Sequence, residues 1–93
     1  MINVSLEPVK ETVKKYGDKQ LIVAIEELSE LQKELCKHLR GKGDKKHIIE
    51  ETADVLIMVG NIREYFDIKD DEISAVIQSK QQRTINRMMK NEV

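Results

Sequence analysis

The sequence KQLIVAIEELSELQKELCKHLRGKGD occupies residues 19–44. Apolar side chains recur through its helical part with a period of about 3.5 residues, at positions 21, 24, 25, 28, 31, 35 and 39. Two glycines, Gly41 and Gly43, then interrupt the helical pattern, and Asp44 is suited to cap a following helix. The stretch predicts a long amphipathic helix over residues 19–39 and a short loop, after which the chain returns in a second helix.

This second long helix is expected from about Lys45 to Phe66. It contains Val-Leu-Ile-Met-Val at residues 55–59, which is apolar on every side of a helix. A helix that is apolar all round is buried on all sides in a folded protein. Residues 55–59 are therefore predicted to lie at the centre of the assembly.

Two further helices flank this pair. Pro8 suits the first turn of a short helix over residues 8–16, which Gly17 ends, and Asp18 is predicted to cap the helix that begins at residue 19. Residues 67–70 form the last turn, and a fourth helix follows to about Asn91. The low aromatic content, 3% of the chain, disfavours a β-sandwich or barrel. We expect one all-α domain over residues 1–93.

Four helices, one of them short, are too few to surround residues 55–59 within a chain of this size. The fold class predicted is therefore an all-α four-helix bundle that is completed by homo-oligomerisation, as a dimer or as a dimer of dimers.

The composition excludes several functions. Sixteen basic and seventeen acidic side chains nearly cancel, whereas a protein that binds nucleic-acid polymers usually carries a positive excess. Cys36 is the single cysteine, so neither an internal disulfide nor a structural zinc site can form. No apolar run reaches the roughly 18 residues of a membrane span, and the N-terminus does not resemble a signal peptide. We expect a cytoplasmic protein with no membrane partner.

Acidic residues occur as pairs on the two long helices. Glu27 with Glu30, and Glu51 with Asp54, are three residues apart, which places each pair on one helix face. Antiparallel helices joined by a short loop can bring the two pairs together. Four carboxylates without a histidine or cysteine suit a hard cation such as Mg²⁺, and Mn²⁺ can occupy similar oxygen sites.

The acidic pattern Glu26-Glu27-x-x-Glu30, twenty intervening residues and Glu51-x-x-Asp54 resembles the signature of the MazG-like, all-α nucleoside triphosphate pyrophosphohydrolases. The flanking stretches, Tyr16 to Leu21, Leu35 to His38, Arg40-Gly41 and Glu50 to Val55, resemble short phage-type members. The likeness extends over roughly residues 16–87.

The resemblance implies a four-helix fold completed by oligomerisation. It also implies hydrolysis of an NTP or dNTP to the monophosphate and pyrophosphate, with a role in cleansing the nucleotide pool. The family's metal-binding and catalytic carboxylates fall on Glu27, Glu30, Glu51 and Asp54. Glu26 belongs to the motif, but it points about 100° away from Glu27 and is only a candidate.

A triphosphate also requires cations. On the fourth helix, the apolar spacing of Ile73, Val76 and Ile77 predicts that Lys80 faces inward, and Arg83 lies one turn further on. This arrangement resembles the C-terminal basic motif of the family, so Lys80 and Arg83 are predicted to bind phosphate. Weaker candidates are Arg87 on the same helix, Lys33, Lys37 and Arg40 on the helix over residues 19–39, and Gln20 for base selection. The residue patterns leave open which carboxylate accepts the proton of the attacking water.

Three alternative functions can be compared with the same sequence. A phosphoribosyl-ATP pyrophosphohydrolase-like enzyme has similar size and reaction, but its Tyr-Thr and Gly-Glu-Glu flanking pattern is absent. A non-catalytic helical interaction module would carry the same acids as surface charges. A Nudix hydrolase is excluded, since it needs a glycine-led motif and an α/β fold that this sequence lacks.

Overall fold

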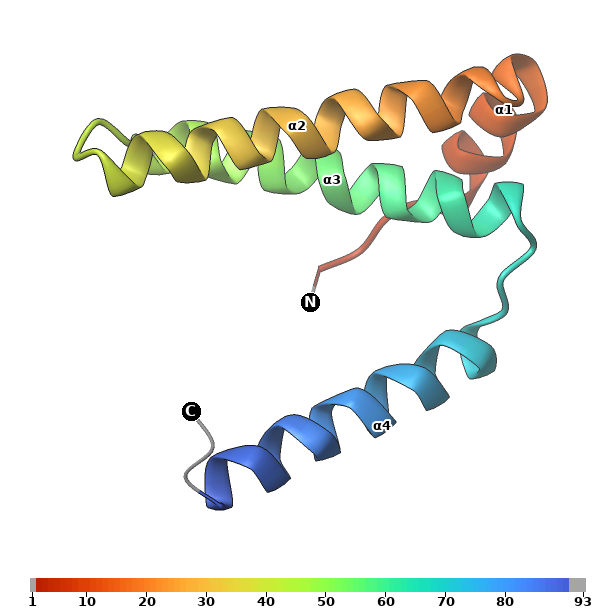
Figure 1. Cartoon of the computed structure of the whole chain (residues 1–93). Coiled ribbons are helices and arrows are strands. Elements are labelled where there is room, and N and C mark those ends of the chain that lie inside the picture. Colours follow the sequence, from red (N-terminus) through yellow and green to blue (C-terminus); the bar gives the residue numbers. More distant parts are fainter. Residues whose placement is uncertain (1, 91–93) are drawn as a thin grey trace.

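The computed structural model describes residues 2–90, which form four helices and no strand (Figure 1). The helices are α1 (Leu6–Tyr16), α2 (Lys19–Leu39), α3 (Lys45–Tyr65) and α4 (Asp70–Met89). The predicted all-α class is confirmed. Helix α1 begins two residues before Pro8, which still lies in the first turn, where a missing N–H costs no hydrogen bond. The predicted end of the fourth helix at Asn91 lies outside the described residues.

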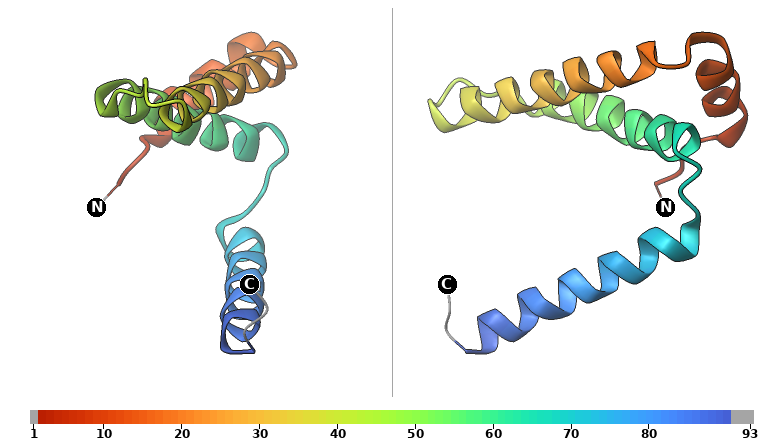
Figure 2. Two further views of the ribbon diagram at one scale, coloured as in Figure 1. Left: turned by 60° about the vertical axis from the view of Figure 1, so that its left-hand side comes forward. Right: turned by 45° about the vertical axis from the view of Figure 1, so that its right-hand side comes forward.

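Helices α2 and α3 lie side by side as an antiparallel hairpin (Figures 1 and 2). Gly41 has a φ of 76°, which glycine adopts without strain. A Cβ atom on Gly43 would lie 2.6 Å from the Cα of His38, so only glycine fits this close approach. The Asp44 carboxylate accepts a hydrogen bond of 2.9 Å from the backbone N of Lys46. The predicted loop and the predicted Asp44 cap are both confirmed.

The predicted Asp18 cap is wrong. Asp18 has helical backbone angles and forms no side-chain cap. The backbone N–H groups of Gln20 and Leu21 already donate to the carbonyls of Gly17 and Asp18, both at 3.0 Å. The Asp18 carboxylate instead accepts the hydroxyl of Tyr65, and this hydrogen bond raises the pKa of Tyr65. The contact joins the start of α2 to the end of α3.

The core of a single chain is small. Among the described residues, Val9 of α1 and Ala24 of α2 are the buried apolar side chains. Helix α1 crosses the open end of the hairpin (Figure 1). A Cβ atom on Gly60 would lie 3.3 Å from Val9 Cγ2, so the absence of a side chain there allows α1 to approach α3 closely. This packing orders the open end of the hairpin, which is the end opposite its loop.

Residues 55–59 are incompletely covered in a single chain. Val55, Leu56 and Met58 are half-buried, while Ile57 and Val59 are 44% and 39% exposed. This agrees with the expectation that one copy is too small to surround the segment. No helix over residues 2–90 is long and apolar enough to cross a membrane.

Helix α4 stands apart from the other helices (Figure 2). Within residues 2–90, no Cα atom of α4 lies within 8 Å of a Cα atom in α1, α2 or α3. The radius of gyration is 16.1 Å, whereas a compact domain of this length would have about 12 Å. A single chain is therefore a helical hairpin with a projecting arm.

Candidate metal centre

The register of the α2–α3 hairpin determines which side chains face each other. Gln20 accepts a hydrogen bond from Asn61, and His47 lies 4.0 Å from the Glu34 carboxylate. The two residues of each pair are equally far along the sequence from the bond between Arg40 and Gly41. The same register brings Glu27 level with Asp54, and Glu30 level with Glu51.

Three of the four predicted metal ligands converge in this register. Glu27, Glu51 and Asp54 each present a carboxylate oxygen, and these oxygens lie within 4.8 Å of one another. All three residues are half-buried. Glu30 is exposed and lies outside this group. We refer to Glu27, Glu51 and Asp54 as the carboxylate cluster.

Burial and mutual repulsion destabilise the charged form of the cluster. Burial is the main cause that raises the pKa of Glu27, followed by the charges of Asp54 and Glu51. The pKa of Glu51 is raised by burial first, and then by the charges of Asp54 and Glu30. Glu51 Oε2 is buried without a hydrogen-bond partner among the described residues. A proton or a cation would relieve this unfavourable arrangement.

The raised pKa values predict how the stability of the metal-free protein depends on pH. The folded state retains protons on Glu27 and Glu51 above pH 4.5, where the unfolded chain releases them. The free energy of unfolding should therefore fall as pH rises through the interval between 4.5 and the raised pKa values.

The measurement is denaturant unfolding in EDTA from about pH 4 to about pH 7. It compares the wild type with Glu27→Gln/Glu51→Gln, whose amides imitate protonated carboxyls. The stability advantage of the double variant should grow with pH. Parallel pH profiles for the two proteins would contradict the electrostatic description of the cluster.

The predicted phosphate-binding residues are not near the cluster in a single chain. Lys80, Arg83 and Arg87 are exposed on α4, which over the described part of the chain is joined to the hairpin by the ion pair of its first residue, Asp70, with Arg63. The prediction that Lys80 faces inward is therefore not met within one copy, because α4 has no neighbouring helix to face.

The remaining candidates lie on α2. Lys33 and Arg40 line a shallow cavity of about 320 Å³, and the Lys37 ammonium lies 3.4 Å from the Glu34 carboxylate. Glu26 is exposed and outside the carboxylate cluster, as its helical position predicts.

Gln20 has a structural partner that the sequence analysis missed. Asn61 Nδ2 donates to Gln20 Oε1 at 3.1 Å, and the two residues are only 2% and 6% exposed, respectively. Gln20 precedes Glu27 by seven residues, and Asn61 follows Asp54 by seven. This shared spacing was a signal that the two amides would meet. The predicted role of Gln20 in base selection stays a prediction.

A double-mutant cycle tests the buried amide pair. Asn61→Leu should destabilise the fold by about 1–3 kcal/mol, since it leaves the Gln20 carbonyl buried without its donor. Gln20→Leu/Asn61→Leu should recover most of this loss, because two apolar groups need no partner. Urea unfolding of the wild type, both single variants and the double variant gives the coupling. Additive losses would show that the two amides do not interact.

Searches of family models, curated proteins and solved structures found no match for this chain. The functional interpretation therefore depends on the motif, the cluster geometry and the arrangement of the helices.

Proposed function

We propose that the protein is a metal-dependent nucleoside triphosphate pyrophosphohydrolase of the MazG-like type. One observation carries the proposal: the hairpin register unites Glu27 from the first acidic motif with Glu51 and Asp54 from the second. Carboxylates scattered as solvated charges would not share a half-buried position, where their repulsion costs stability. Among the functions considered, this convergence best supports a hydrolase that converts a nucleoside triphosphate to the monophosphate and pyrophosphate.

The cluster residues fit a divalent cation of the Mg²⁺ type. All donors are carboxylate oxygens, which Mg²⁺ prefers, and Mn²⁺ accepts the same ligands. Glu51 Oε2 is buried and lacks a partner in the described structure. Within residues 2–90, neither the cluster nor Glu30 forms an ion pair with a basic side chain. Glu27, Glu51 and Asp54 would hold the ion, which when bound supplies positive charge opposite the phosphates.

The other proposed residues would act on water and phosphate. Water attacks the α-phosphorus, the bond from that phosphorus to the bridging oxygen breaks, and pyrophosphate leaves. Glu30 is the predicted fourth ligand. Its carboxylate lies outside the cluster, but its charge acts on both Glu27 and Glu51, so Glu30 is also our candidate to accept the proton of the attacking water. Lys80 and Arg83 would neutralise the leaving pyrophosphate.

Self-association belongs to the same proposal. Residues 55–59 are partly exposed in one copy, and burial of their apolar surface favours a dimer or tetramer. The bundle of the predicted fold class would then form from helices of more than one chain.

A nucleotide panel tests the function. Purified protein is incubated with standard and damaged NTPs and dNTPs and with phosphoribosyl-ATP, and pyrophosphate is measured with Mg²⁺, with Mn²⁺ and with EDTA. Metal-dependent release of pyrophosphate and monophosphate is expected for at least one nucleotide. Preference for phosphoribosyl-ATP would identify the sibling enzyme. Absence of release from every nucleotide would leave the interaction module as the better description.

A further inference from the structure

The two ends of the helical hairpin differ in charge. Residues 33–47, which include the loop between α2 and α3, contain six basic and two acidic residues and both histidines of the chain. The whole chain has sixteen basic and seventeen acidic residues, so the rest of it has ten and fifteen. The near-neutral balance that argues against a nucleic-acid partner is therefore an average over regions of opposite sign.

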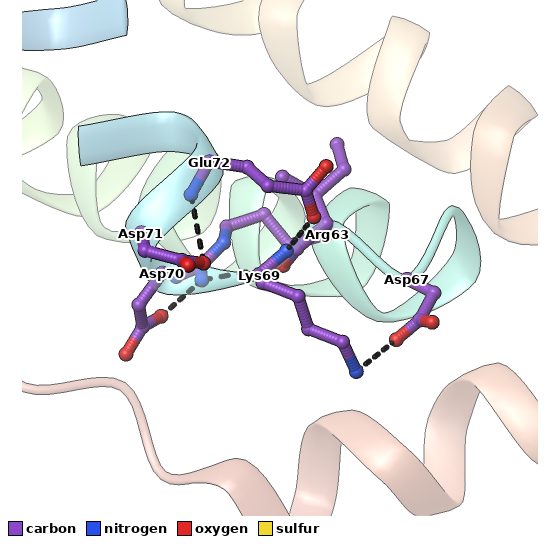
Figure 3. A network of polar contacts seen from close by, with 7 residues as sticks. Arg63, Asp67, Lys69, Asp70, Asp71 and Glu72 are labelled. Atoms are coloured by element: carbon purple, nitrogen blue, oxygen red, sulfur yellow. Dashed lines mark hydrogen bonds and ion pairs between the residues drawn. The ribbon is translucent and has the colours of Figure 1, made fainter. Parts of the chain in front are cut away.

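The acidic end neutralises its own cations. It lies where α3 turns into α4 (Figure 3), and residues 63–72 include five acidic and two basic side chains. Arg63 pairs with Asp70, and the Lys69 ammonium lies 2.7 Å from the Asp67 carboxylate. Both cations of this end are thus matched by acids of the same turn.

Most cations at the loop end have no such match. The two acids there are already engaged. The Glu34 carboxylate is only 12% exposed and lies 3.4 Å from the Lys37 ammonium, and Asp44 accepts the backbone N–H of Lys46. Five exposed cations form no ion pair within residues 2–90, and we refer to them as the basic loop end: Lys33, Arg40, Lys42, Lys45 and Lys46.

The loop that carries these cations is ordered and uncovered. The backbone N–H of Gly41 donates to the carbonyl of His38, and that of Lys42 donates to the carbonyl of Lys37, both at 2.9 Å. The loop lies at the end of the hairpin opposite α1 (Figure 1), and residues 39–47 are all exposed. Its cations are therefore available to a partner outside the chain.

The composition of this end favours a phosphate polymer over other anionic partners. Residues 40–47 contain no apolar side chain that could enter a membrane. No aromatic residue occurs from residue 17 to residue 64, whereas protein interfaces and single-strand binding sites use aromatic anchors. Lysine and arginine are attracted to closely spaced phosphates irrespective of base sequence, and a DNA duplex presents one charge per about 1.7 Å of its axis.

We propose that the basic loop end binds the phosphate backbone of double-stranded DNA without reading its sequence. Lys33 and Arg40 are seven residues apart on α2, which is about 10 Å, and Lys45 extends the group onto α3. The basic loop end is thus wide enough to contact several phosphates. This inference goes beyond the proposed function and does not rest on it.

The salt dependence of binding tests the proposal. The fluorescence anisotropy of a short labelled DNA duplex is measured at several salt concentrations. Five phosphate contacts predict a slope of about −4 to −5 for the logarithm of the association constant against the logarithm of the salt concentration. The Kd should be about 10⁻⁴ to 10⁻⁶ M near physiological salt. A slope near zero, or tighter binding of the corresponding single strand, would overturn the proposal.

A triple variant locates the contact. Lys42→Gln/Lys45→Gln/Lys46→Gln removes three cations that have no assigned role in nucleotide hydrolysis. The slope should become shallower by about 3, and binding at low salt should weaken roughly tenfold or more. Glutamine is a good helix former, so α3 should still begin at residue 45, and circular dichroism checks that the helices persist. Unchanged binding of this variant would contradict the proposal.

A matched variant on α1 separates a local contact from general attraction. Lys10→Gln/Lys14→Gln/Lys15→Gln changes the net charge by the same amount at three exposed positions. It should leave both the slope and the affinity for the duplex unchanged. Equal losses in the two triple variants would show attraction to the overall charge of the chain, and would overturn the assignment to the basic loop end.

Other polyanions identify the class of partner. Poly-glutamate and phosphatidylserine vesicles also carry dense negative charge, but neither has a nucleic-acid backbone. At equal charge concentration the wild type is expected to bind the DNA duplex more tightly than either. Tighter binding of poly-glutamate would indicate an acidic protein as the partner, and tighter binding of the vesicles an anionic membrane. Either result would overturn the proposal.

Discussion

Glu51→Gln is expected to reduce metal-dependent pyrophosphate release by roughly a thousandfold or more, since several kcal/mol of transition-state stabilisation depend on the bound cation. Glu27→Gln and Asp54→Asn should have the same effect, because each removes one oxygen donor from the carboxylate cluster. The fold should persist. Loss of a repelling charge leaves the metal-free protein equally stable or more stable.

Glu30→Gln separates two roles. It should also abolish activity, but its effect on Mg²⁺ binding distinguishes a ligand from a proton acceptor. The measurement is the rise in melting temperature on addition of Mg²⁺ without nucleotide. Retention of this rise in Glu30→Gln, with its loss in Glu51→Gln, would assign Glu30 to proton transfer. Glu11→Gln on the exposed face of α1 is the matched control. Full activity in any two of the four variants would refute the assignment of the acidic site.

Lys80→Ala or Arg83→Ala is expected to lower kcat/KM by roughly tenfold to a thousandfold, through loss of one or two charge-assisted contacts to phosphate. The Mg²⁺-induced rise in melting temperature without nucleotide should hardly change, because neither side chain is proposed to contact the ion. Arg87→Ala should have a smaller effect, since it lies one turn beyond Arg83.

Steady-state kinetics of these variants test this prediction. Lys14→Ala on α1 is the charge-matched control. Wild-type kcat/KM in both Lys80→Ala and Arg83→Ala would place the phosphates elsewhere, with Lys33, Lys37 and Arg40 as the next candidates. That outcome would leave the carboxylate cluster unaffected.

The helical hairpin and its acidic motif followed from local signals. The apolar period over residues 19–39 and the glycines at residues 41 and 43 predict two antiparallel helices, and Asp44 predicts where the second begins. These features depend on backbone conformations and on neighbours within one or two turns. The pairing of Glu27 with Asp54 was also predictable, because a loop of a few residues allows little freedom in the register of two long helices.

Only the tertiary structure decided contacts that depend on distant helices. Asp18 forms a hydrogen bond with Tyr65 in place of a cap, and Gln20 meets Asn61, because the packed register brings the end of α3 against the start of α2. The same register leaves Glu30 outside the carboxylate cluster. The separation of Lys80 from the acids is also a tertiary result. An apolar period shows which face of α4 is apolar, but the direction in which α4 leaves α3 depends on the folded turn, where Arg63 donates to the Ile68 carbonyl and Glu72 accepts from the backbone N–H of Lys69.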